Sequence, residues 1–382
     1  MKKNSKTIAY IGTYAKWEMH QMIDICFLHM CALVADQVVC YKDATTLDYV
    51  KQMGEEHGFK DKVKIKKINV FRSKNKYLEL LGFIYAAFLN IILLLKNNRK
   101  DYIVYNYDNV FSLHIINLLN HLLSKKIVIL CHDEMELLIT CKGGLFAKIK
   151  RKLVRNFFLD RRIDKNIEFI VLGSSILNNL QNYLPKQSFL HFHSIEHPYY
   201  FHEIKPAEKY TIPKTIGLVG VISESKGLNE FITFVDSVSS LNYNVKIKVI
   251  GRISTHQYDS FFKEKKVDIN WDYLPREEME EKIEELDYIL YFYPTNSYKL
   301  IASGAVFDAI CMNKPILAIK NDFFEHVLSS IGYPALLVNG VDELVNFIKE
   351  QKPLFYNTQE YKGLSMFTPQ YNSIILKEIL DN

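Results

Sequence analysis

The sequence is short of the residues that mark several classes of protein. Six cysteines occur among 382 residues, none in a CxxC pair, and the histidines show no zinc-like spacing. These shortages argue against a disulfide scaffold and a structural zinc site, and they favour reduced thiols in a cytoplasmic protein. The first residues lack an apolar core of about 7–15 residues, so we expect no signal peptide. No repeat of solenoid length occurs either.

Excess charge of one sign is also missing. The chain has 48 Lys and Arg against 43 Asp and Glu, a net charge of +5. That excess is too small to indicate nucleic acid when no binding motif accompanies it, so we expect no nucleic-acid partner. Hydrophobic residues make up 48% and charged residues 24%, as in ordinary globular proteins. Domains of about 100–200 residues would make two domains of this length.

One segment is nearly apolar enough to cross a membrane. Tyr77 to Leu95 is interrupted by Glu79 and Asn90, and strand-like patterns lie on both sides of it. A membrane span takes about 20 apolar residues. We therefore expect a buried helix on one face of a sheet, with a helix at a membrane interface as the alternative.

Short apolar runs alternate with helical patterns through the N-terminal half. The predicted strands are Thr7–Gly12, Gln37–Tyr41, Val63–Val70, Asp101–Tyr107, Lys126–Cys131 and Ile167–Leu172. Apolar runs of this kind are typical of a parallel sheet covered by helices on both faces. The periodicity fades between His191 and Pro213, which we interpret as a linker.

A second alternation follows the linker. Its predicted strands are Thr215–Val221, Val245–Ile250, Ile269–Tyr273, Tyr288–Tyr293, Pro315–Ile319 and Ala335–Val338. The pattern predicts an α/β protein of two Rossmann-like domains, residues 1–205 and 206–368. Ligands of such sheets bind beyond the carboxyl ends of the strands, so the cleft between the domains is the expected site.

The first candidate cluster follows the strand Thr215–Val221. Gly220 ends the strand, and Lys226-Gly227 precedes a helix. Gly220 would let a ligand approach the backbone, and free N–H groups at a helix start favour phosphate. Lys226 adds a positive charge for the same anion. A plain strand-to-helix turn with a solvated lysine explains the pattern equally well.

The second cluster follows the strand Tyr288–Tyr293. Ser303-Gly304 stands where a helix begins, so Ser303 is a candidate N-cap and the amides there are a candidate diphosphate cradle. Asp308 follows about one helical turn later, where a carboxylate would accept hydrogen bonds from ribose hydroxyls. We favour this function over a solvent-facing helix residue, because the residues around Asp308 are apolar.

Together the two clusters resemble the donor half of the GT-B glycosyltransferases. The likeness is to the large retaining family that includes many bacterial capsule and O-antigen enzymes. It rests on Gly220, Lys226-Gly227, Ser303-Gly304, Asp308-Ala309 and Asn313-Lys314-Pro315, and it covers about residues 216–318.

The resemblance implies a hexosyltransferase-like enzyme with a nucleotide-sugar donor and no metal or other cofactor. Lys226 would neutralise the diphosphate, the amides of Ser303 and Gly304 would cradle it, and Asp308 would hold the ribose. Tyr293 or Tyr298 would contact the base or the sugar. The C-terminal helix, within residues 369–382, would pack back on the first domain.

Two positions depart from that family's pattern. Val221 stands where the family has arginine, and Arg252 at the end of the next strand is the candidate substitute. Leu300 stands where the family has the first acid of a pair. These departures leave open a non-catalytic accessory protein on the same fold. A two-domain sugar-nucleotide epimerase shares the architecture, but its usual cluster of acids and histidines is not evident.

A third cluster, His132-Asp133-Glu134, directly follows the strand Lys126–Cys131. In an inverting enzyme one of these carboxylates would deprotonate the acceptor hydroxyl, with His132 as the alternative base. In a retaining enzyme His132 would orient the donor sugar. A helix N-cap at Asp133 is the structural alternative. Gly12 and Thr13, after the first strand, would face the acceptor.

The segment 142–165 combines nine Lys and Arg residues with apolar residues at near-helical spacing. Basic amphipathic helices bind anionic lipid surfaces, although a solvated helix face produces the same pattern. Because acceptors of this enzyme class are often lipid-linked, we expect a saccharide or lipid-linked acceptor in cell-surface polysaccharide synthesis. The corresponding location is the cytoplasm, peripheral at the inner face of the plasma membrane.

Overall fold

The computed structural model describes residues 5–14, 20–73, 75–140, 144–204, 210–241, 245–269, 274–354 and 361–382. Its internal contacts divide the chain into two units. Unit 1 comprises Met1–Tyr200, Leu300–Ala302 and Ser365–Asn382, and unit 2 comprises Phe201–Lys299 and Ser303–Leu364.

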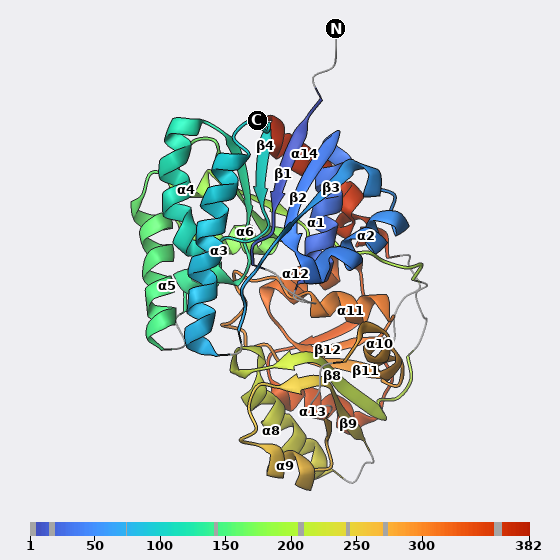
Figure 1. Ribbon diagram of the computed structural model, residues 1–382. Coiled ribbons are helices and arrows are strands. Elements are labelled where there is room, and N and C mark those ends of the chain that lie inside the picture. The colour runs from blue at the N-terminus through green and yellow to red at the C-terminus, as the bar shows by residue number, and fades with distance from the viewer. Residues whose placement is uncertain are drawn as a thin grey trace. The chain divides into compact units, whose positions relative to one another are not determined.

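Within the described residues, unit 1 contains a seven-stranded parallel sheet of order β3-β2-β1-β4-β5-β6-β7 (Figure 1). Its strands are β1 Thr7–Ile11, β2 Gln37–Asp43, β3 Val63–Ile68, β4 Tyr102–Tyr105, β5 Lys126–Leu130, β6 Ile167–Leu172 and β7 Phe192–Ile195. Strand β7 lies inside the segment that the sequence pattern presented as linker. That interpretation is therefore wrong for residues 192–195, where the short run beside His191 and His193 gave little strand signal.

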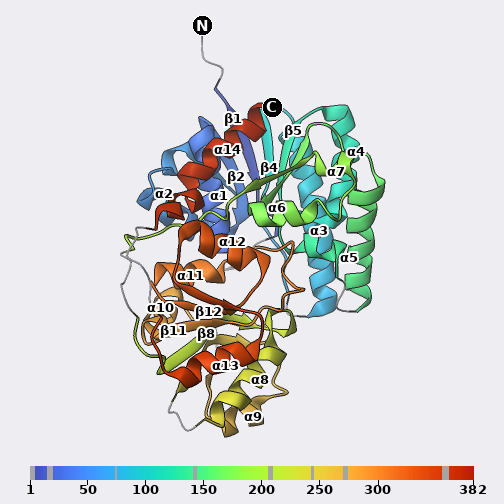
Figure 2. The same ribbon diagram turned by 180° about the vertical axis from the view of Figure 1, so that it is seen from behind.

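Helices cover both faces of this sheet. They are α1 Gln21–Val34, α2 Leu47–Glu56, α3 Lys76–Lys96, α4 Val110–Leu123, α5 Leu145–Arg155, α6 Ser174–Leu180, α7 Lys186–Phe189 and α14 Pro369–Asp381. Helix α4 packs against both α3 and α5, and the three form one layer, while α1, α2 and α14 lie across the sheet from them (Figures 1 and 2).

Burial along the strands explains the sheet. Strands β1, β4 and β5 are buried at nearly every position, as expected for central strands between two helix layers. On edge strand β3 the apolar residues Val63, Ile65 and Ile68 are half-buried, and Lys64, Lys66 and Lys67 are exposed. Lysines on an edge oppose pairing with another chain.

The C-terminal helix belongs to unit 1, as predicted. Leu376, Ile379 and Leu380 of α14 join the same buried core as Cys26 and Phe27 of α1. Thr368 caps α14 by accepting from the N–H of Tyr371, and Pro369 occupies the first turn, where its missing N–H costs nothing. More than 160 residues of sequence separate α14 from β7, so only the tertiary fold brings this helix to the first sheet.

Within the described residues, unit 2 contains a six-stranded parallel sheet of order β10-β9-β8-β11-β12-β13. Its strands are β8 Thr215–Ile222, β9 Lys246–Ile253, β10 Asp268–Ile269, β11 Tyr288–Tyr291, β12 Ile316–Ile319 and β13 Ala335–Val338. Its helices are α8 Leu228–Ser239, α9 Asp259–Glu264, α10 Arg276–Glu284, α11 Ala305–Cys311, α12 Asp322–Ile331 and α13 Val341–Glu350. Helices α8 and α13 pack together over one face, and α11 and α12 cover the other (Figure 2).

Helix α3 is only partly the buried helix that the sequence predicted. Among the described residues it is the one helix long and apolar enough to cross a membrane by length and composition, and 39% of the window Leu78–Lys96 is buried. Phe83, Leu93 and Leu94 face the core, whereas Leu81 and Phe88 are 56% and 60% exposed. The outer side of the helix is therefore apolar as well, which periodicity cannot reveal when both sides carry the same residue type.

Candidate functional site

Both sheets have a position where the strand order reverses, and the predicted site residues gather there. In unit 1 it lies between β1 and β4, and in unit 2 between β8 and β11. Connections on the two sides of such a point leave in opposite directions, so a crevice opens beyond the carboxyl ends of these strands. Gly12 and Thr13 follow β1, and His132 to Glu134 follow β5 beside β4. Gly220 and Lys226 lie at the end of β8, and Tyr293 follows β11.

Three glycines shape the end of β8. Gly220 has φ +94° and nothing within 4 Å of where a Cβ would stand, so a ligand has room beside its backbone. Gly251, its partner on β9, has φ +139°, and an added Cβ would lie 2.1 Å from the Gly220 carbonyl oxygen. At Gly227 an added Cβ would lie 1.9 Å from the Phe292 oxygen. Gly227 is thus required by close packing on the end of β11, which the sequence alone did not reveal.

Lys226 stands half-buried at the start of α8. Its ammonium lies 5.8 Å from the centre of the Tyr293 ring, a cation–π distance. The residues that the structure describes give it no carboxylate partner, so its charge is open to an anion. Ser297 donates to the Ser225 carbonyl at 3.1 Å, which holds the loop after β11 against the loop that carries Lys226.

Tyr293 and Tyr298 form an aromatic wall beside Lys226. Their ring centres are 4.6 Å apart, and Phe324 packs 5.0 Å from Tyr293 on the other side. Tyr298 adopts φ +55°, a left-handed backbone that is uncommon for tyrosine. Its half-buried ring offers a flat face of the kind on which bases and sugars stack.

Ser303 does not cap the next helix, so that structural prediction is wrong. The N-cap of α11 is Gly304, without a side-chain cap, and the Ser303 hydroxyl lies 3.0 Å from the Tyr293 hydroxyl. Ser303 is buried, and this hydrogen bond ties the loop to the aromatic wall. The amides near Gly304 stay candidates for the diphosphate, because no side chain occupies the start of the helix.

Asp308 and Arg252 are on different elements of unit 2, helix α11 and strand β9. Asp308 is half-buried on α11. The pKa of Tyr291 is held well above its ordinary value, first by the burial of Tyr291 and next by the negative charge of Asp308. Arg252 is exposed on β9 directly opposite Val221 of β8. Paired residues of parallel strands share one face of the sheet, so Arg252 stands beside the position where the resembled family has arginine.

In unit 1 a small pocket opens at the switch point, lined by Tyr14, His20, Asp24, Asn106, Tyr107, Leu130 and His132. Gly12 borders it closely, since an added Cβ would lie 3.2 Å from the Asn106 amide nitrogen. Thr13 is different, because its hydroxyl is buried and donates to Asn90 at 2.7 Å. This contact fastens α3 to the loop after β1, so the structure does not favour Thr13 as an acceptor contact.

His132 presents a lone pair to this pocket. Its Nε2 lies 2.8 Å from the Asn106 carbonyl oxygen, which only accepts, so Nε2 carries the proton. The residues that the structure describes leave Nδ1 without a hydrogen-bond partner. Burial, with His20 and His197 nearby, lowers the pKa of His132 to about 3. The ring is therefore neutral near pH 7, with Nδ1 as an acceptor.

Asp133 and Glu134 differ sharply in exposure. Asp133 is exposed at the start of a 3-10 turn, Asp133–Leu138. Glu134 is buried, pairs with Lys150 and accepts from the Tyr107 hydroxyl. The geometry thus disfavours the prediction that Glu134 is the base, because its charge is already engaged inside the fold. Asp133 has the access that a base needs.

The sequence reading missed a buried polar network behind this pocket. Asp24 pairs with Lys42 and accepts from the amide of Asn106 at 3.0 Å. Asp108 is fully buried and accepts a hydrogen bond from the backbone N–H of His132 at 3.1 Å. Burial holds the pKa of Asp108 well above its ordinary value. Asn106 to Asp108 directly follow β4, which ends at Tyr105, whereas the sequence pattern extended this strand to Tyr107 and so placed Asn106 inside it.

The basic segment 142–165 is not one helix. Residues 145–155 form α5, a π-helical turn covers Asn156–Asp160, and a loop leads to β6, while residues 142 and 143 lie outside the described part. Phe157 and Phe158 are buried core residues. The exposed apolar positions are Leu145 and Ile149, 76% and 41% exposed, beside exposed Lys148 and Lys152.

Comparison with known proteins places this geometry in a fold class. No family model and no curated protein matches the sequence. Among solved structures, S. aureus TarM crystallised with UDP, alpha-GlcNAc-glycerol and fondaparinux aligns with a TM-score of 0.61 at 10% identity, covering 99% of this chain and 100% of that one. The lipopolysaccharide outer core galactosyltransferase WaaB aligns with a TM-score of 0.57 at 12% identity, covering 98% and 99%. Arabidopsis thaliana UGT89C1 gives 0.54 at 11%, covering 98% and 99%.

The chain has the GT-B fold. The predicted fold class is thereby confirmed. The alignments span the full length of the GT-B structures, so both sheets and the returning helix α14 are part of the likeness. At this level of identity the likeness concerns the fold, and the retaining subfamily stays a prediction.

Proposed function

We propose that this GT-B protein transfers a hexose from a nucleotide-diphosphate donor to a hydroxyl of a saccharide acceptor. The observation that carries the proposal is the arrangement at the end of β8 and β11. Lys226, for which the described residues provide no carboxylate, stands there with an open glycine backbone and a tyrosine wall at the switch point of unit 2. Three neighbours in fold are named as glycosyltransferases or were crystallised with UDP, which supports the same chemistry.

The donor would be held by charge and stacking. Lys226 neutralises the diphosphate beside Gly220, and the backbone near Ser303 and Gly304 adds N–H donors. Asp308 accepts from the ribose hydroxyls, and Tyr298 stacks on the base or sugar. Arg252, opposite Val221, is a second cation for the leaving diphosphate.

The chemical step breaks the bond between the anomeric carbon and the diphosphate oxygen and forms a bond to the acceptor oxygen. With inversion, Asp133 takes the hydroxyl proton. With retention, the departing phosphate oxygen takes it. His132 suits a positioning role in both cases, because a pKa of about 3 makes it a poor proton acceptor while neutral Nδ1 accepts a hydrogen bond from a sugar hydroxyl.

We further propose a lipid-linked acceptor met at an anionic membrane surface, within cell-surface polysaccharide synthesis. Exposed Lys148 and Lys152 of α5 support this, together with the exposed apolar residues Leu145 and Ile149 of the same helix. The neighbouring helices α3 and α4 add exposed apolar residues and no unpaired acid, since Glu79 pairs with Arg72 at 2.6 Å. Basic and apolar groups together are what an anionic lipid surface attracts.

The test is a binding and turnover assay with UDP-, GDP-, CMP- and dTDP-sugars. A ligand that binds the folded state raises the melting temperature, so the screen identifies the base. We expect Lys226→Ala and Asp308→Asn to weaken binding at least about tenfold, equivalent to about 1.4 kcal/mol. Lys263→Ala, an exposed lysine on α9, is the matched control and should bind normally. Equal affinity in all three variants would contradict the donor site.

A non-catalytic accessory protein is the second candidate, and Leu300 favours it. Leu300 is buried, and its N–H donates to Glu136 at 2.9 Å, so the position offers no acid of its own. This candidate predicts weak or absent donor binding together with stable association with a transferase. Release of nucleoside diphosphate by the purified protein, lost in Asp308→Asn, would exclude it.

A further inference from the structure

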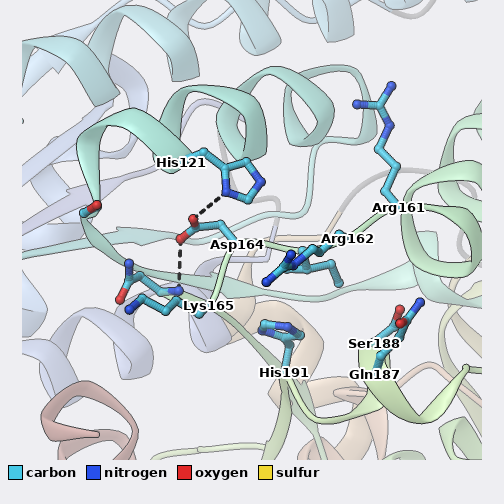
Figure 3. A pocket seen from close by; sticks show the side chains of 11 residues that line it. His121, Arg161, Arg162, Asp164, Lys165, Gln187, Ser188 and His191 are labelled. Carbon is cyan, nitrogen blue, oxygen red and sulfur yellow. Dashed lines mark hydrogen bonds and ion pairs between the residues drawn. The ribbon is translucent and has the colours of Figure 1, made fainter.

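A second pocket lies at the amino ends of strands β5 and β6 of the unit 1 sheet. It has a volume of about 840 Å³ and is bounded by the end of α4, the loop before β6 and the segment around α7 (Figure 3). Its lining residues 121–124 and 161–166 precede β5 and β6, whereas the candidate site residues follow β1, β4 and β5. The pocket is therefore at the amino ends of the strands, away from the proposed chemistry, and its volume is that of a small-molecule site.

The pocket is lined by three cationic side chains. Arg161, Arg162 and Lys165 are exposed, and the described residues give none of their side chains a carboxylate partner. Asp164 is the one carboxylate in the lining, and it is buried. It accepts from His121 and Asn120, both at 2.9 Å, and from the N–H of Asn166 at 3.0 Å, so its charge is engaged from within (Figure 3).

Two further side chains give the pocket specific polar contacts. Ser188 is 1% exposed, and its Oγ has no hydrogen-bond partner among the described residues. A buried hydroxyl without a partner is rare, and a ligand oxygen at this wall would supply one. His191 Nδ1 lies 2.9 Å from the Ile167 carbonyl oxygen and so donates to it, which fixes the ring and leaves Nε2 for a ligand.

We propose that this pocket binds a phosphate ester. Three cations that have no carboxylate partner in the described part of the chain match the charge of a phosphate group, and the guanidinium of Arg162 pairs with two of its oxygens. Ser188 donates to a third oxygen. The volume exceeds the size of a lone phosphate, so the ligand carries an organic body. A soluble phosphate ester and a phospholipid headgroup share this chemistry. Exposed Leu118 and Leu122 on neighbouring α4, 63% and 84% exposed, are consistent with the second source.

The experiment compares two double variants of the full chain. Arg162→Gln with Lys165→Gln removes two pocket cations, and Lys64→Gln with Lys67→Gln removes two cations from edge strand β3, at the far side of the sheet. Glycerol 3-phosphate binding is measured by calorimetry. Binding to phosphatidylglycerol vesicles, against phosphatidylcholine vesicles, is measured by co-sedimentation. We expect the pocket variant to weaken binding at least about tenfold and the β3 variant to retain it.

The two binding measurements distinguish a soluble phosphate ester from a phospholipid headgroup. Binding of glycerol 3-phosphate that is lost in the pocket variant assigns a soluble ester, and loss confined to phosphatidylglycerol vesicles assigns a lipid headgroup. Ser188→Ala should reduce the affinity of the same probe by a smaller factor. Nucleotide-sugar binding should be unchanged in the pocket variant, so this result is independent of the proposed donor site. Equal binding in both double variants, or no binding of either probe to the unaltered protein, would overturn the proposal.

Discussion

Two histidines with lowered pKa values, half-buried His132 and buried His197, make the stability of unit 1 depend on pH. Burial lowers the pKa of His132 to about 3 and that of His197 to about 4. An unfolded histidine has a pKa near ~6.5. Below that value the unfolded chain takes up protons that the folded chain does not, so acid favours unfolding. The stabilising contribution is complete above pH ~6.5 and is lost as the pH falls from there toward 4.

We therefore predict a steep loss of stability between pH 6.5 and 4. Each histidine contributes a slope of up to about 1.4 kcal/mol per pH unit in this range. Urea unfolding at a series of pH values measures the slope, and His132→Gln should make it shallower. His256→Gln serves as the control, because His256 is exposed on unit 2. A slope that His132→Gln leaves unchanged would show that the ring is not buried neutral.

Single residues that are neighbours in the sequence have different surroundings in the fold. His132, Asp133 and Glu134 are consecutive, yet the first lines a pocket, the second meets solvent and the third is buried against Lys150. Sequence reasoning located the cluster because charged residues followed an apolar strand. Assigning the roles required exposure, which depends on Lys150, 16 positions away on α5.

At the scale of elements, the outer side of α3 and α4 is the most unusual feature. Its exposed apolar residues are Leu78, Leu81, Ile84, Tyr85, Phe88, Ile92, Leu95, Ile115, Leu118 and Leu122. Helix α3 packs on α4, and basic α5 packs on the other side of α4 (Figure 1), so these exposed residues belong to two neighbouring helices. Exposed apolar surfaces of this extent mark interaction sites.

We predict that this surface contributes to membrane binding. Phe88→Ser with Leu118→Ser should lower co-sedimentation with anionic vesicles by at least about tenfold, because burying each large apolar side chain contributes roughly 1.5–3 kcal/mol. Ile374→Ser is the control, since Ile374 is 61% exposed on α14, across the sheet from α3. Equal co-sedimentation of variant and control would restrict membrane contact to other surfaces.

At the scale of the whole chain, unit 1 is closed by its last residues. Asn372 on α14 is fully buried, accepts from the N–H of Glu196 at 2.9 Å, and donates to Met366 and Thr368. The end of β7 is thereby fixed to α14. A sheet assembled from residues 7–195 thus depends on a helix that begins at Pro369.

We predict that Asn372→Ala lowers the free energy of unfolding by about 1–3 kcal/mol, because the buried N–H of Glu196 loses its acceptor and the half-buried carbonyls of Met366 and Thr368 each lose a donor. Gln370→Ala, at an exposed position in the same helix, should change it by less than about 0.5 kcal/mol. Urea unfolding followed by circular dichroism gives both values. Hydrogen exchange should show faster opening in β7 and α1, and unchanged exchange there would mean that α14 is dispensable.

By itself the sequence determined the alternation of strands and helices and the two parallel sheets. These follow from local patterns, since apolar strands five residues long can be satisfied only between helix layers. It also located charged and glycine residues at strand ends. Tertiary structure decided what no local pattern contains: that β7 completes the first sheet, that Gly227 packs on Phe292, and that Glu134 is engaged by Lys150. It also left the outer side of α3 uncovered, because exposure depends on which distant segments arrive to cover a side chain.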